Sequence, residues 1–375
     1  MKFTDVNPFT KKQQNRINKS IISTVKKGDF ILGNNVRKFE KKFSTLSNSK
    51  YAIGCATGTD ALILALKSLN LKKNHEVIIP GMSYISTGLA VALNNIKIVF
   101  ADIDEETGLI SLENIKKKIS KNTKAVIPVN LYGQKIDVKL LREIVGRRVF
   151  IIEDSAQSHF ASTCTNCEKN DHALCYKTEK SQRYADLSCY SFYPAKNLGA
   201  YGDGGIITTD NANLYKKICI LRNLGSVKKN VHQYEGLNSR LDTLQASVLL
   251  EKIKYTPLHN NYRRKISDFY DEELAFLDEI KLTNTDPGSS RHLYVIRTKY
   301  RDKLLKFLIK NNINSQIHYP YSLNRAGGLK NKVRSTKLPV SEKWVKQCLS
   351  LPLHPYMKFK DAERVVKTIK RFFNY

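Results

Sequence analysis

The sequence has no long hydrophobic segment. Its 375 residues contain no uninterrupted apolar run near the roughly 18 residues that a membrane-spanning helix needs. The N-terminal sequence MKFTDVNPFTKKQQNR also lacks the apolar core of a secretory signal. We therefore expect a soluble protein of the cytoplasm that has no membrane partner.

Acidic residues are scarce. The chain has 34 Asp and Glu against 63 Lys and Arg, which gives a net charge of +29. The basic residues are dispersed, in pairs such as Lys26-Lys27 and Lys72-Lys73, and no RNP motif or zinc-finger array accompanies them. The preferred explanation of this charge is a solvated basic surface, and the next is binding of an anionic small substrate. A nucleic-acid partner comes third.

Cysteine is also infrequent, and its number is odd. Seven cysteines in a chain without a secretory signal do not predict a disulfide framework. Four of them lie among apolar or small residues, which is typical of reduced packing positions: Cys55, Cys189, Cys219 and Cys348.

The other three cysteines lie in a polar stretch, 162–185, that we interpret as an insertion between two core strands. It contains Cys164-x2-Cys167-x4-His172-x2-Cys175. Zinc is commonly held by three cysteines and one histidine with a close first pair, so this spacing suggests a structural zinc site. The alternative is that the thiols are coincidental. We expect no catalytic metal.

The distribution of apolar residues predicts an α/β fold. Short runs rich in Val and Ile recur at 76–80, 96–103, 124–131, 148–155, 189–194 and 204–209, and amphipathic stretches such as LENIKKKI and VKLLREIV separate several of them. Such alternation indicates a largely parallel sheet. We expect a large domain over residues 1–250 and a smaller C-terminal α+β domain over residues 251–375.

Three segments carry candidate chemistry, because open α/β sheets bind ligands in the loops after their strands. In GCATGTDAL, Gly58 and Thr59 begin a predicted helix, where free N–H groups suit a phosphate, although a plain helix cap would look the same. In IEDSAQSH, Asp154 ends a strand and Gln157 follows. Asp154 could be a metal ligand, a base, the partner of a protonated heterocycle, or structural.

The third segment, SFYPAKNLGAYGDGG, contains Lys196 in nearly uncharged surroundings and is followed by four glycines. Glycine allows the backbone to approach a ligand closely. A lysine in such a place loses its proton more readily and can act as an amine nucleophile toward a carbonyl. The alternative is a solvated loop lysine.

With these segments in order, the sequence resembles the DegT/DnrJ/EryC1/StrS family of sugar aminotransferases. The resemblance extends from GDFILGNNVRKFE at 28–40 to LPLHP at 351–355. It implies a type I aminotransferase fold, with a large mixed-sheet domain that binds pyridoxal 5'-phosphate.

The resemblance also implies roles for individual residues. Lys196 would bind the cofactor's aldehyde and carry the transferred proton, and Asp154 would pair with the ring nitrogen. Gln157 would lie near the ring's phenolic oxygen, and Tyr84 would stack on the ring.

The remaining implied roles concern the phosphate, the partner subunit and the sugar. The implied phosphate cradle is Gly58, Thr59 and Ser191. Asn238, in GLNSRLD, would reach the neighbouring subunit's phosphate site, which implies a homodimer with shared active sites, and Arg240 would help to order that loop. His318 and Tyr319, in IHYP, would lie near the sugar.

Two positions depart from the family pattern. Asn130 and Leu224 stand where many members have histidine, so we expect altered substrate contacts at both. Some members have histidine in place of the lysine and perform dehydration, but Lys196 favours transamination.

The expected reaction transfers an amino group, from L-glutamate as donor, to a nucleotide-linked keto-sugar, at C3 of a dTDP-3-keto-6-deoxyhexose. Three alternatives stay open. They are C4 amination of a dTDP-, UDP- or GDP-4-keto-6-deoxyhexose, a nucleic-acid-binding protein on this scaffold with a zinc-knuckle-like loop, and a dehydratase or a regulator that retains the cofactor.

Overall fold

The computed structural model describes residues 1–6, 9–161, 184–334 and 337–375. The helices are α1 (Lys11–Lys27), α2 (Asn34–Leu46), α3 (Gly58–Ser68), α4 (Ile85–Leu93), α5 (Leu112–Lys118), α6 (Val138–Val145), α7 (Ala212–Leu221), α8 (Thr243–Lys252), α9 (Thr256–Leu274), α10 (Arg301–Lys310), α11 (Pro339–Gln347) and α12 (Phe359–Phe373). The strands are β1 (Tyr51–Cys55), β2 (Glu76–Pro80), β3 (Lys97–Ala101), β4 (Thr123–Val126), β5 (Phe150–Asp154), β6 (Leu187–Ser191), β7 (Gly205–Thr209), β8 (Ser226–Lys228), β9 (Val231–His232), β10 (Lys281–Leu282), β11 (Tyr294–Arg297), β12 (Val333–Arg334) and β13 (Cys348–Leu351).

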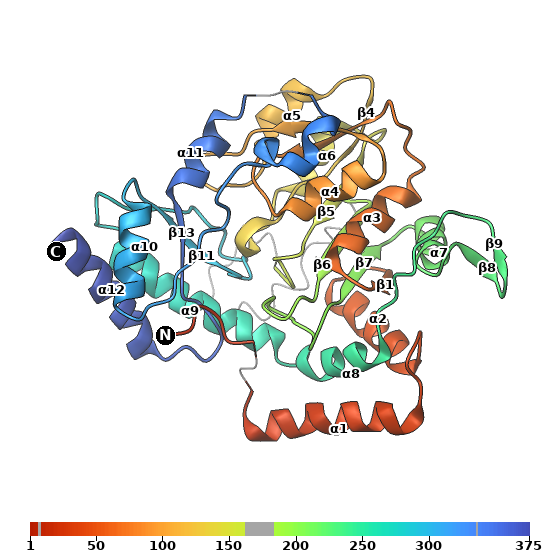
Figure 1. The fold of residues 1–375 in the computed structure, drawn as a ribbon, viewed down its shortest axis with the longest axis horizontal. Helices are drawn as coiled ribbons and strands as arrows, with labels where there is room; N and C mark the ends of the chain where they lie inside the picture. Colours follow the sequence, from red (N-terminus) through yellow and green to blue (C-terminus); the bar gives the residue numbers. More distant parts are fainter. Residues whose placement is uncertain (7–8, 162–183, 335–336) are drawn as a thin grey trace.

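A mixed sheet organises most of the molecule (Figure 1). Among the described residues it has eight strands, in the order β1-β7-β6-β5-β4-β2-β3-β12. The five neighbouring pairs from β6 to β12 are parallel, and β7 runs antiparallel to both β1 and β6. This arrangement confirms the predicted α/β architecture.

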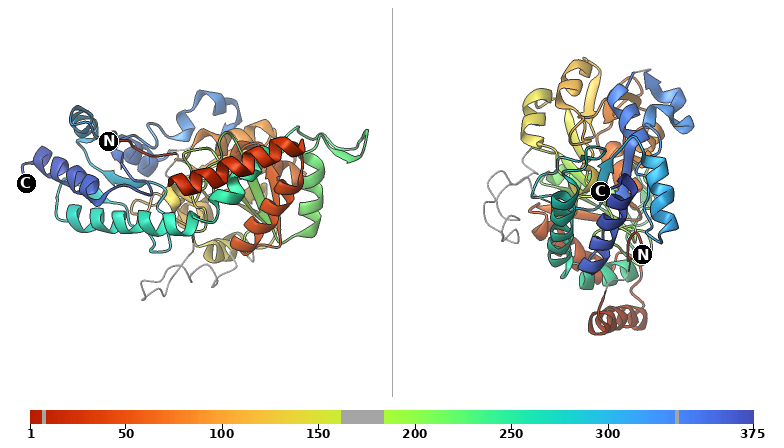
Figure 2. Two further views of the ribbon diagram at one scale, coloured as in Figure 1. Left: turned by 90° about the horizontal axis from the view of Figure 1, so that it is seen from below. Right: turned by 90° about the vertical axis from the view of Figure 1, so that its left-hand side faces the viewer.

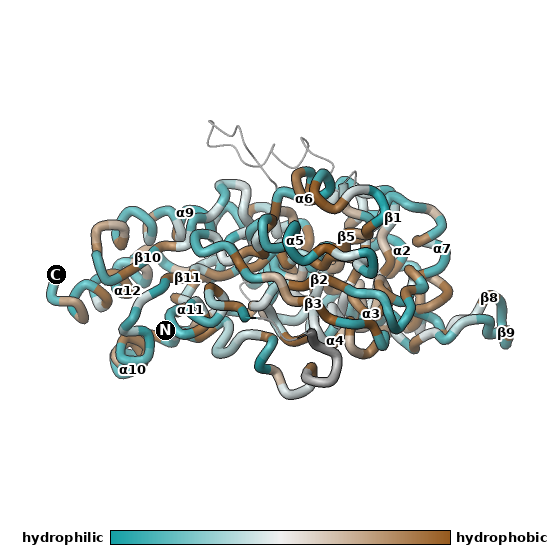
Figure 3. Tube along the Cα trace, turned by 90° about the horizontal axis from the view of Figure 1, so that it is seen from above, coloured by the Kyte–Doolittle hydropathy of each residue, from teal (hydrophilic) through white to brown (hydrophobic). Residues whose placement is uncertain are grey.

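Helices cover both faces of the sheet, and successive strand residues therefore alternate between two apolar cores. In β2, Val77 and Ile79 pack with α3, α4 and α7, whereas Ile78 faces the opposite side, with α5 and α6. Farther along that second face, α2 and α8 cover β1, β6 and β7. Figure 3 shows hydrophobic residues along the central strands and a mixture of hydrophilic and hydrophobic residues along the surrounding helices. Burial on both faces explains why these strands are continuously apolar in sequence.

A second region contains a three-stranded antiparallel sheet, β10-β11-β13, packed with α9, α10 and α12 around its own apolar cluster. Figures 1 and 2 show it at the opposite end of the molecule from the β8-β9 hairpin. The predicted division at residues 250 and 251 stays a prediction. It falls within α8, and β12 returns from the C-terminal part of the chain to pair with β3.

Two further sequence expectations can be compared with the described residues. Cys55, Cys189, Cys219 and Cys348 are free thiols, and all but Cys219 are buried, which confirms their interpretation as reduced packing residues. In the described part of the chain, no helix combines the length and apolarity needed to cross a membrane.

Candidate active site

The candidate site lies at the carboxyl ends of three strands that are close in the sheet. Asp154 ends β5, Ser191 ends the adjacent β6, and Tyr84 follows β2 as the N-cap of α4. Lys196 lies in the loop after β6, where its N–H donates to the Tyr193 carbonyl at 2.8 Å. Parallel strands end at the same edge of a sheet, which is why residues from distant parts of the sequence meet here.

Asp154 is a buried carboxylate with few donors. Its Oδ2 accepts from Thr87 Oγ1 at 2.8 Å and its Oδ1 accepts from the Ala156 N–H at 3.2 Å. Burial raises the pKa of Asp154, while these two hydrogen bonds and the positive charge of Lys196 act in the opposite direction. A buried carboxylate of this kind favours a cationic partner.

Lys196 has the properties of an activated amine. Burial lowers the pKa of Lys196 to about 8, although the negative charge of Asp154 opposes the shift. Within the described residues Lys196 makes no ion pair with a carboxylate. An appreciable fraction of neutral amine is therefore available near neutral pH, as the sequence suggested.

His159 lies beside this lysine. Burial lowers the pKa of His159 to about 3, and the charge of Lys196 contributes. The ring stays neutral at physiological pH, although a hydrogen bond with the Ser191 backbone acts in the opposite direction. Sequence reasoning did not select His159, because a histidine after a strand is usually a packing residue.

Gly58, Thr59 and Ser191 lie together at the N-terminus of α3. Gly58 is the first residue of that helix, and a Cβ at Gly58 would lie 2.5 Å from the Ser191 Cβ. Only glycine allows this approach. Thr59 Oγ1 lies 2.7 Å from Ser86 Oγ, so a hydroxyl that the sequence did not single out joins the group. Three hydroxyls and the free N–H groups of a first helical turn form a surface that suits a phosphate.

Tyr84 and Tyr319 form the aromatic part of the site. Tyr84 is 57% exposed, and its ring lies 6.0 Å from that of Tyr319. Gln157 is fixed between two partners, since its Oε1 accepts from the Tyr132 N–H at 2.7 Å and its Nε2 donates to Tyr319 Oη at 2.9 Å. Burial raises the pKa of Tyr319, so this hydroxyl keeps its proton.

His318, expected near the sugar, is held from two sides. Its Nδ1 lies 2.9 Å from Ser350 Oγ, and its ring stacks on Phe3 with 5.7 Å between centroids. Burial lowers the pKa of His318 to about 4, and the charge of Lys196 adds to the shift. The imidazole is therefore neutral at physiological pH and can offer hydrogen bonds but no charge to a substrate.

A buried polar network lies next to Lys196. Asn197 Nδ2 donates to Asn260 Oδ1 and to the Ser290 carbonyl, each at 2.8 Å, and Asn197 Oδ1 lies 2.9 Å from His292 Nδ1. These contacts join the Lys196 loop to α9 and to the segment before β11. Sequence reasoning missed the network. Its only signal was an uncharged amide directly after Lys196.

The structure gives Asn130 a role different from the expected substrate contact. Asn130 is completely buried, its Nδ2 donates to Glu153 Oε1 at 3.0 Å and Ser155 Oγ at 2.9 Å, and its Oδ1 accepts from the Ile136 N–H at 3.0 Å. Its amide is fully used in holding the loop after β4 against β5. These contacts favour a structural role for Asn130, and an altered substrate contact at this position stays a prediction.

Asn238 and Leu224 lie near the base of the β8-β9 hairpin, which projects from the body of the molecule (Figure 1). Asn238 is exposed and pairs through its backbone with Asn223, whose Oδ1 accepts from Arg240 Nη1 at 3.0 Å. In the described residues the Asn238 side chain contacts none of the cradle residues of its own chain. Leu224 is 45% exposed.

The predicted zinc ligands Cys164, Cys167, His172 and Cys175 lie outside the described residues. Within those residues, no group of three or more His, Cys, Asp or Glu side chains is placed to hold a metal. Those residues do not include the four predicted ligands, so the structural zinc site stays a prediction.

The described side chains fit pyridoxal phosphate. The hydroxyl-lined helix end suits its phosphate, the buried Asp154 suits a protonated ring nitrogen, and Lys196 suits its aldehyde. Tyr84 offers an exposed ring beside them.

Comparison with known proteins agrees with this geometry. The profile of the DegT/DnrJ/EryC1/StrS aminotransferase family matches residues 11–370. The chain belongs to this family. It is 35% identical over 373 residues to dTDP-3-amino-3,6-dideoxy-alpha-D-galactopyranose transaminase of Aneurinibacillus thermoaerophilus, covering 99% of each chain.

Two more family comparisons extend this result. UDP-2-acetamido-2-deoxy-3-oxo-D-glucuronate aminotransferase of Pseudomonas aeruginosa is 33% identical, with 95% of this chain and 96% of the relative covered. The crystal structure of Streptomyces venezuelae DesV with a ketimine intermediate superposes with a TM-score of 0.92 at 31% identity, covering 100% of this chain and 98% of DesV. This DegT/DnrJ/EryC1/StrS protein is therefore an aminotransferase with the predicted fold.

Proposed function

We propose that this protein transfers an amino group from L-glutamate to C3 of a dTDP-3-keto-6-deoxyhexose, with pyridoxal phosphate as cofactor. The observation that carries the proposal is the buried neighbourhood of Lys196 and Asp154, an amine with a pKa lowered to about 8 beside a carboxylate with a raised pKa. Family membership favours this enzyme over the nucleic-acid-binding alternative.

Each residue of the site has a separate role in the proposed reaction. Bound pyridoxal phosphate supplies an aldehyde that exchanges amino groups and a ring that withdraws electrons. Lys196 Nζ holds the cofactor and then accepts and returns the proton that moves during transamination. Asp154 would pair with the protonated ring nitrogen, and Tyr84 would offer its ring for stacking. Gly58, Thr59 and Ser191 hold the phosphate.

The choice of C3 rests on the relatives. Those from Aneurinibacillus and Pseudomonas have names that place the amino or oxo group at C3, one on a dTDP sugar and one on a UDP sugar. The net charge of +29 favours the approach of a multiply anionic nucleotide sugar. His318 and Tyr319, beside Gln157, would contact the sugar.

A homodimer with shared sites completes the proposal. Asn238 is exposed beside the projecting hairpin, where it can reach a neighbouring subunit, and Tyr234 and Leu224 expose apolar surface nearby. Mixed dimers of Lys196→Ala and Asn238→Ala subunits test this arrangement. If the sites are shared, each mixed dimer contains one site with both substitutions and one site with neither, so activity is recovered. No recovery above the homodimers would contradict it.

The decisive test of the activity is the visible absorption spectrum of the protein with pyridoxal phosphate, before and after addition of L-glutamate. We expect a yellow band that bleaches as the cofactor accepts the amino group. A band that does not respond to L-glutamate would contradict the proposed donor, and no band would contradict the proposed cofactor.

C4 amination is the alternative for the acceptor. Supplying the glutamate-treated protein with dTDP-3-keto- or dTDP-4-keto-6-deoxyhexose separates the two. We expect the yellow band to return with the 3-keto sugar alone, and a return with the 4-keto sugar alone would transfer the assignment to C4.

A further inference from the structure

Two buried hydroxyls form a chain that ends on Asp154. Ser83 Oγ lies 3.0 Å from Thr87 Oγ1, which lies 2.8 Å from Asp154 Oδ2. Ser83 belongs to the loop after β2, Thr87 to the first turn of α4, and Asp154 to the end of β5. All three are buried, with exposed fractions of 3%, 0% and 5% in that order.

The direction of these hydrogen bonds follows from the number of protons. An ionised carboxylate can only accept, so Thr87 must donate its single hydroxyl proton to Asp154. Thr87 then accepts from Ser83. Both hydroxyl dipoles therefore point their positive ends toward Asp154, and each bond strengthens the other.

This chain opposes the effect of burial on Asp154. Burial favours the protonated carboxyl, whereas a donated hydrogen bond stabilises the carboxylate. The titratable groups around Asp154 are Lys196, whose charge lowers the pKa of Asp154, and Tyr319 and Cys189, whose own pKa values the charge of Asp154 raises. Among these three, only Lys196 can carry a positive charge, and it is unchanged in every variant compared below, so its effect cancels in their comparison. Thr87 and the Ala156 N–H then remain as the donors that keep the carboxylate ionised.

We propose that Thr87, supported by Ser83, is a positioning residue that keeps Asp154 ionised and aimed at the ring nitrogen of the cofactor. This inference rests on the proposed function, because it concerns the partner of Asp154. It assigns Thr87 an electrostatic role in addition to its place at the start of α4.

The test uses pyridoxamine 5'-phosphate, which has no aldehyde and cannot bond to Lys196. Its dissociation constant for the cofactor-free dimer is measured by calorimetry as a function of pH, in the wild type and in Thr87→Val, which keeps the shape and removes the donor. We expect pyridoxamine phosphate to bind Thr87→Val about tenfold more weakly than the wild type in the pH range between the two Asp154 pKa values. In that range Asp154 is ionised in the wild type and protonated in the variant. The pH at which affinity falls on acidification should rise by about one unit, because a carboxyl without its donor takes up a proton at higher pH.

Three variants separate this role from simple damage to the fold. Thr87→Ser keeps the donor and should restore the wild-type pH profile. Ser83→Ala should raise the pH at which affinity falls, as Thr87→Val does, but by a smaller amount. Thr368→Val removes a hydroxyl in α12 that donates to the Arg364 carbonyl at 2.7 Å, and it should change nothing.

If affinity falls on acidification at the same pH in Thr87→Val as in the wild type, the inference is overturned, while the proposed cofactor is unaffected. If Thr87→Val does not fold, Ser83→Ala is the test. An unchanged pH for the fall in affinity of Ser83→Ala would then overturn the proposed role of the two hydroxyls. Failure of the wild type to bind pyridoxamine phosphate would refute the proposed cofactor, and the inference with it.

Discussion

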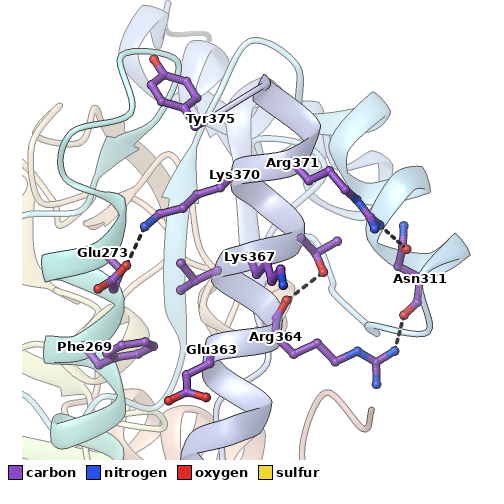
Figure 4. A pocket seen from close by; sticks show the side chains of 11 residues that line it. Phe269, Glu273, Asn311, Glu363, Arg364, Lys367, Lys370, Arg371 and Tyr375 are labelled. Atoms are coloured by element: carbon purple, nitrogen blue, oxygen red, sulfur yellow. Dashed lines mark hydrogen bonds and ion pairs between the residues drawn. The ribbon is translucent and has the colours of Figure 1, made fainter.

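Two regions of this protein place lysine near a carboxylate, and they use it differently. In the C-terminal region a cavity of about 790 Å³ lies beside α9 and α12, and Figure 4 shows its lining. There Lys370 Nζ forms an ion pair with Glu273 Oε2 at 2.6 Å, and Arg364 Nη2 donates to the Asn311 carbonyl at 2.8 Å. At the candidate active site, Lys196 lies near Asp154 without such a pair among the described residues.

The contrast shows that volume alone does not identify a catalytic site. In the C-terminal cavity Lys370 and Glu273 are paired with each other and partly exposed, so their charges are screened by solvent and offer little free energy to a ligand. At the active site, burial shifts the pKa of Lys196 down and that of Asp154 up. A ligand with an aldehyde and a cationic ring would react with the neutral amine and pair with the carboxylate. Binding such a ligand would therefore offset the free-energy cost of burying these two groups.

Replacing the two lysines should give the largest separation between the regions. Lys196→Ala should lower kcat about a thousandfold or more, because in the proposed function the residue both holds the cofactor and transfers the proton. Lys370→Ala should retain kcat close to that of the wild type. Steady-state assays of both variants check this, with pyridoxamine phosphate binding as a measure of intact folding. Wild-type-like activity of Lys196→Ala would refute its role.

Replacing the two carboxylates should give the next largest separation. Asp154→Asn keeps the shape of the side chain but removes the charge that stabilises a protonated ring nitrogen, and kcat should fall about a hundredfold. Glu273→Gln is the matched control and should leave kcat unchanged. Equal losses in the two variants would show that the charge of Asp154 has no special function.

The pH dependence of cofactor attachment sharpens the comparison further. Only the neutral amine attacks an aldehyde, and the pKa of Lys196 is lowered to about 8. The rate at which the cofactor-free protein takes up pyridoxal phosphate should rise about tenfold per pH unit below pH 8 and level off above it. Stopped-flow absorbance measures this rate.

Lys252 provides a control for that profile. Burial also lowers the pKa of Lys252 to about 8, but its Nζ lies over the rings of Phe9 and Tyr201, 5.2 and 4.7 Å from their centroids. Lys252→Met should leave the profile unchanged. In the wild type, borohydride trapping with peptide mass spectrometry should find the label on Lys196. A label on Lys252 would contradict the assignment.

The smallest effect should come from breaking the ion pair beside the C-terminal cavity. Lys370→Met should lower the free energy of unfolding by less than about 1 kcal/mol, because both partners are partly exposed and the pair is screened by solvent. Urea denaturation measures this change. A loss several times larger would mean that α12 depends on the pair for its attachment to α9.

The strand ends and their loops were predictable from the sequence. Apolar runs bounded by turn residues placed Asp154 at the end of a strand, and the glycines after Lys196 marked a loop open to a ligand. The resemblance to known aminotransferases added Tyr84 and Ser191. The contacts that fix these residues were not predictable, because Thr87 lies 67 positions from Asp154 and His292 lies 95 from Asn197.

By itself, the sequence determined the order of helices and strands, because apolar periodicity and turn residues act over a few positions. Only the tertiary structure decided which polar side chains become buried together. Asn130 became part of the support for β5, Lys196 acquired a pKa of about 8, and Asp154 gained a hydroxyl chain. Burial and the charges of distant neighbours set these properties, and both arise only when the chain is packed.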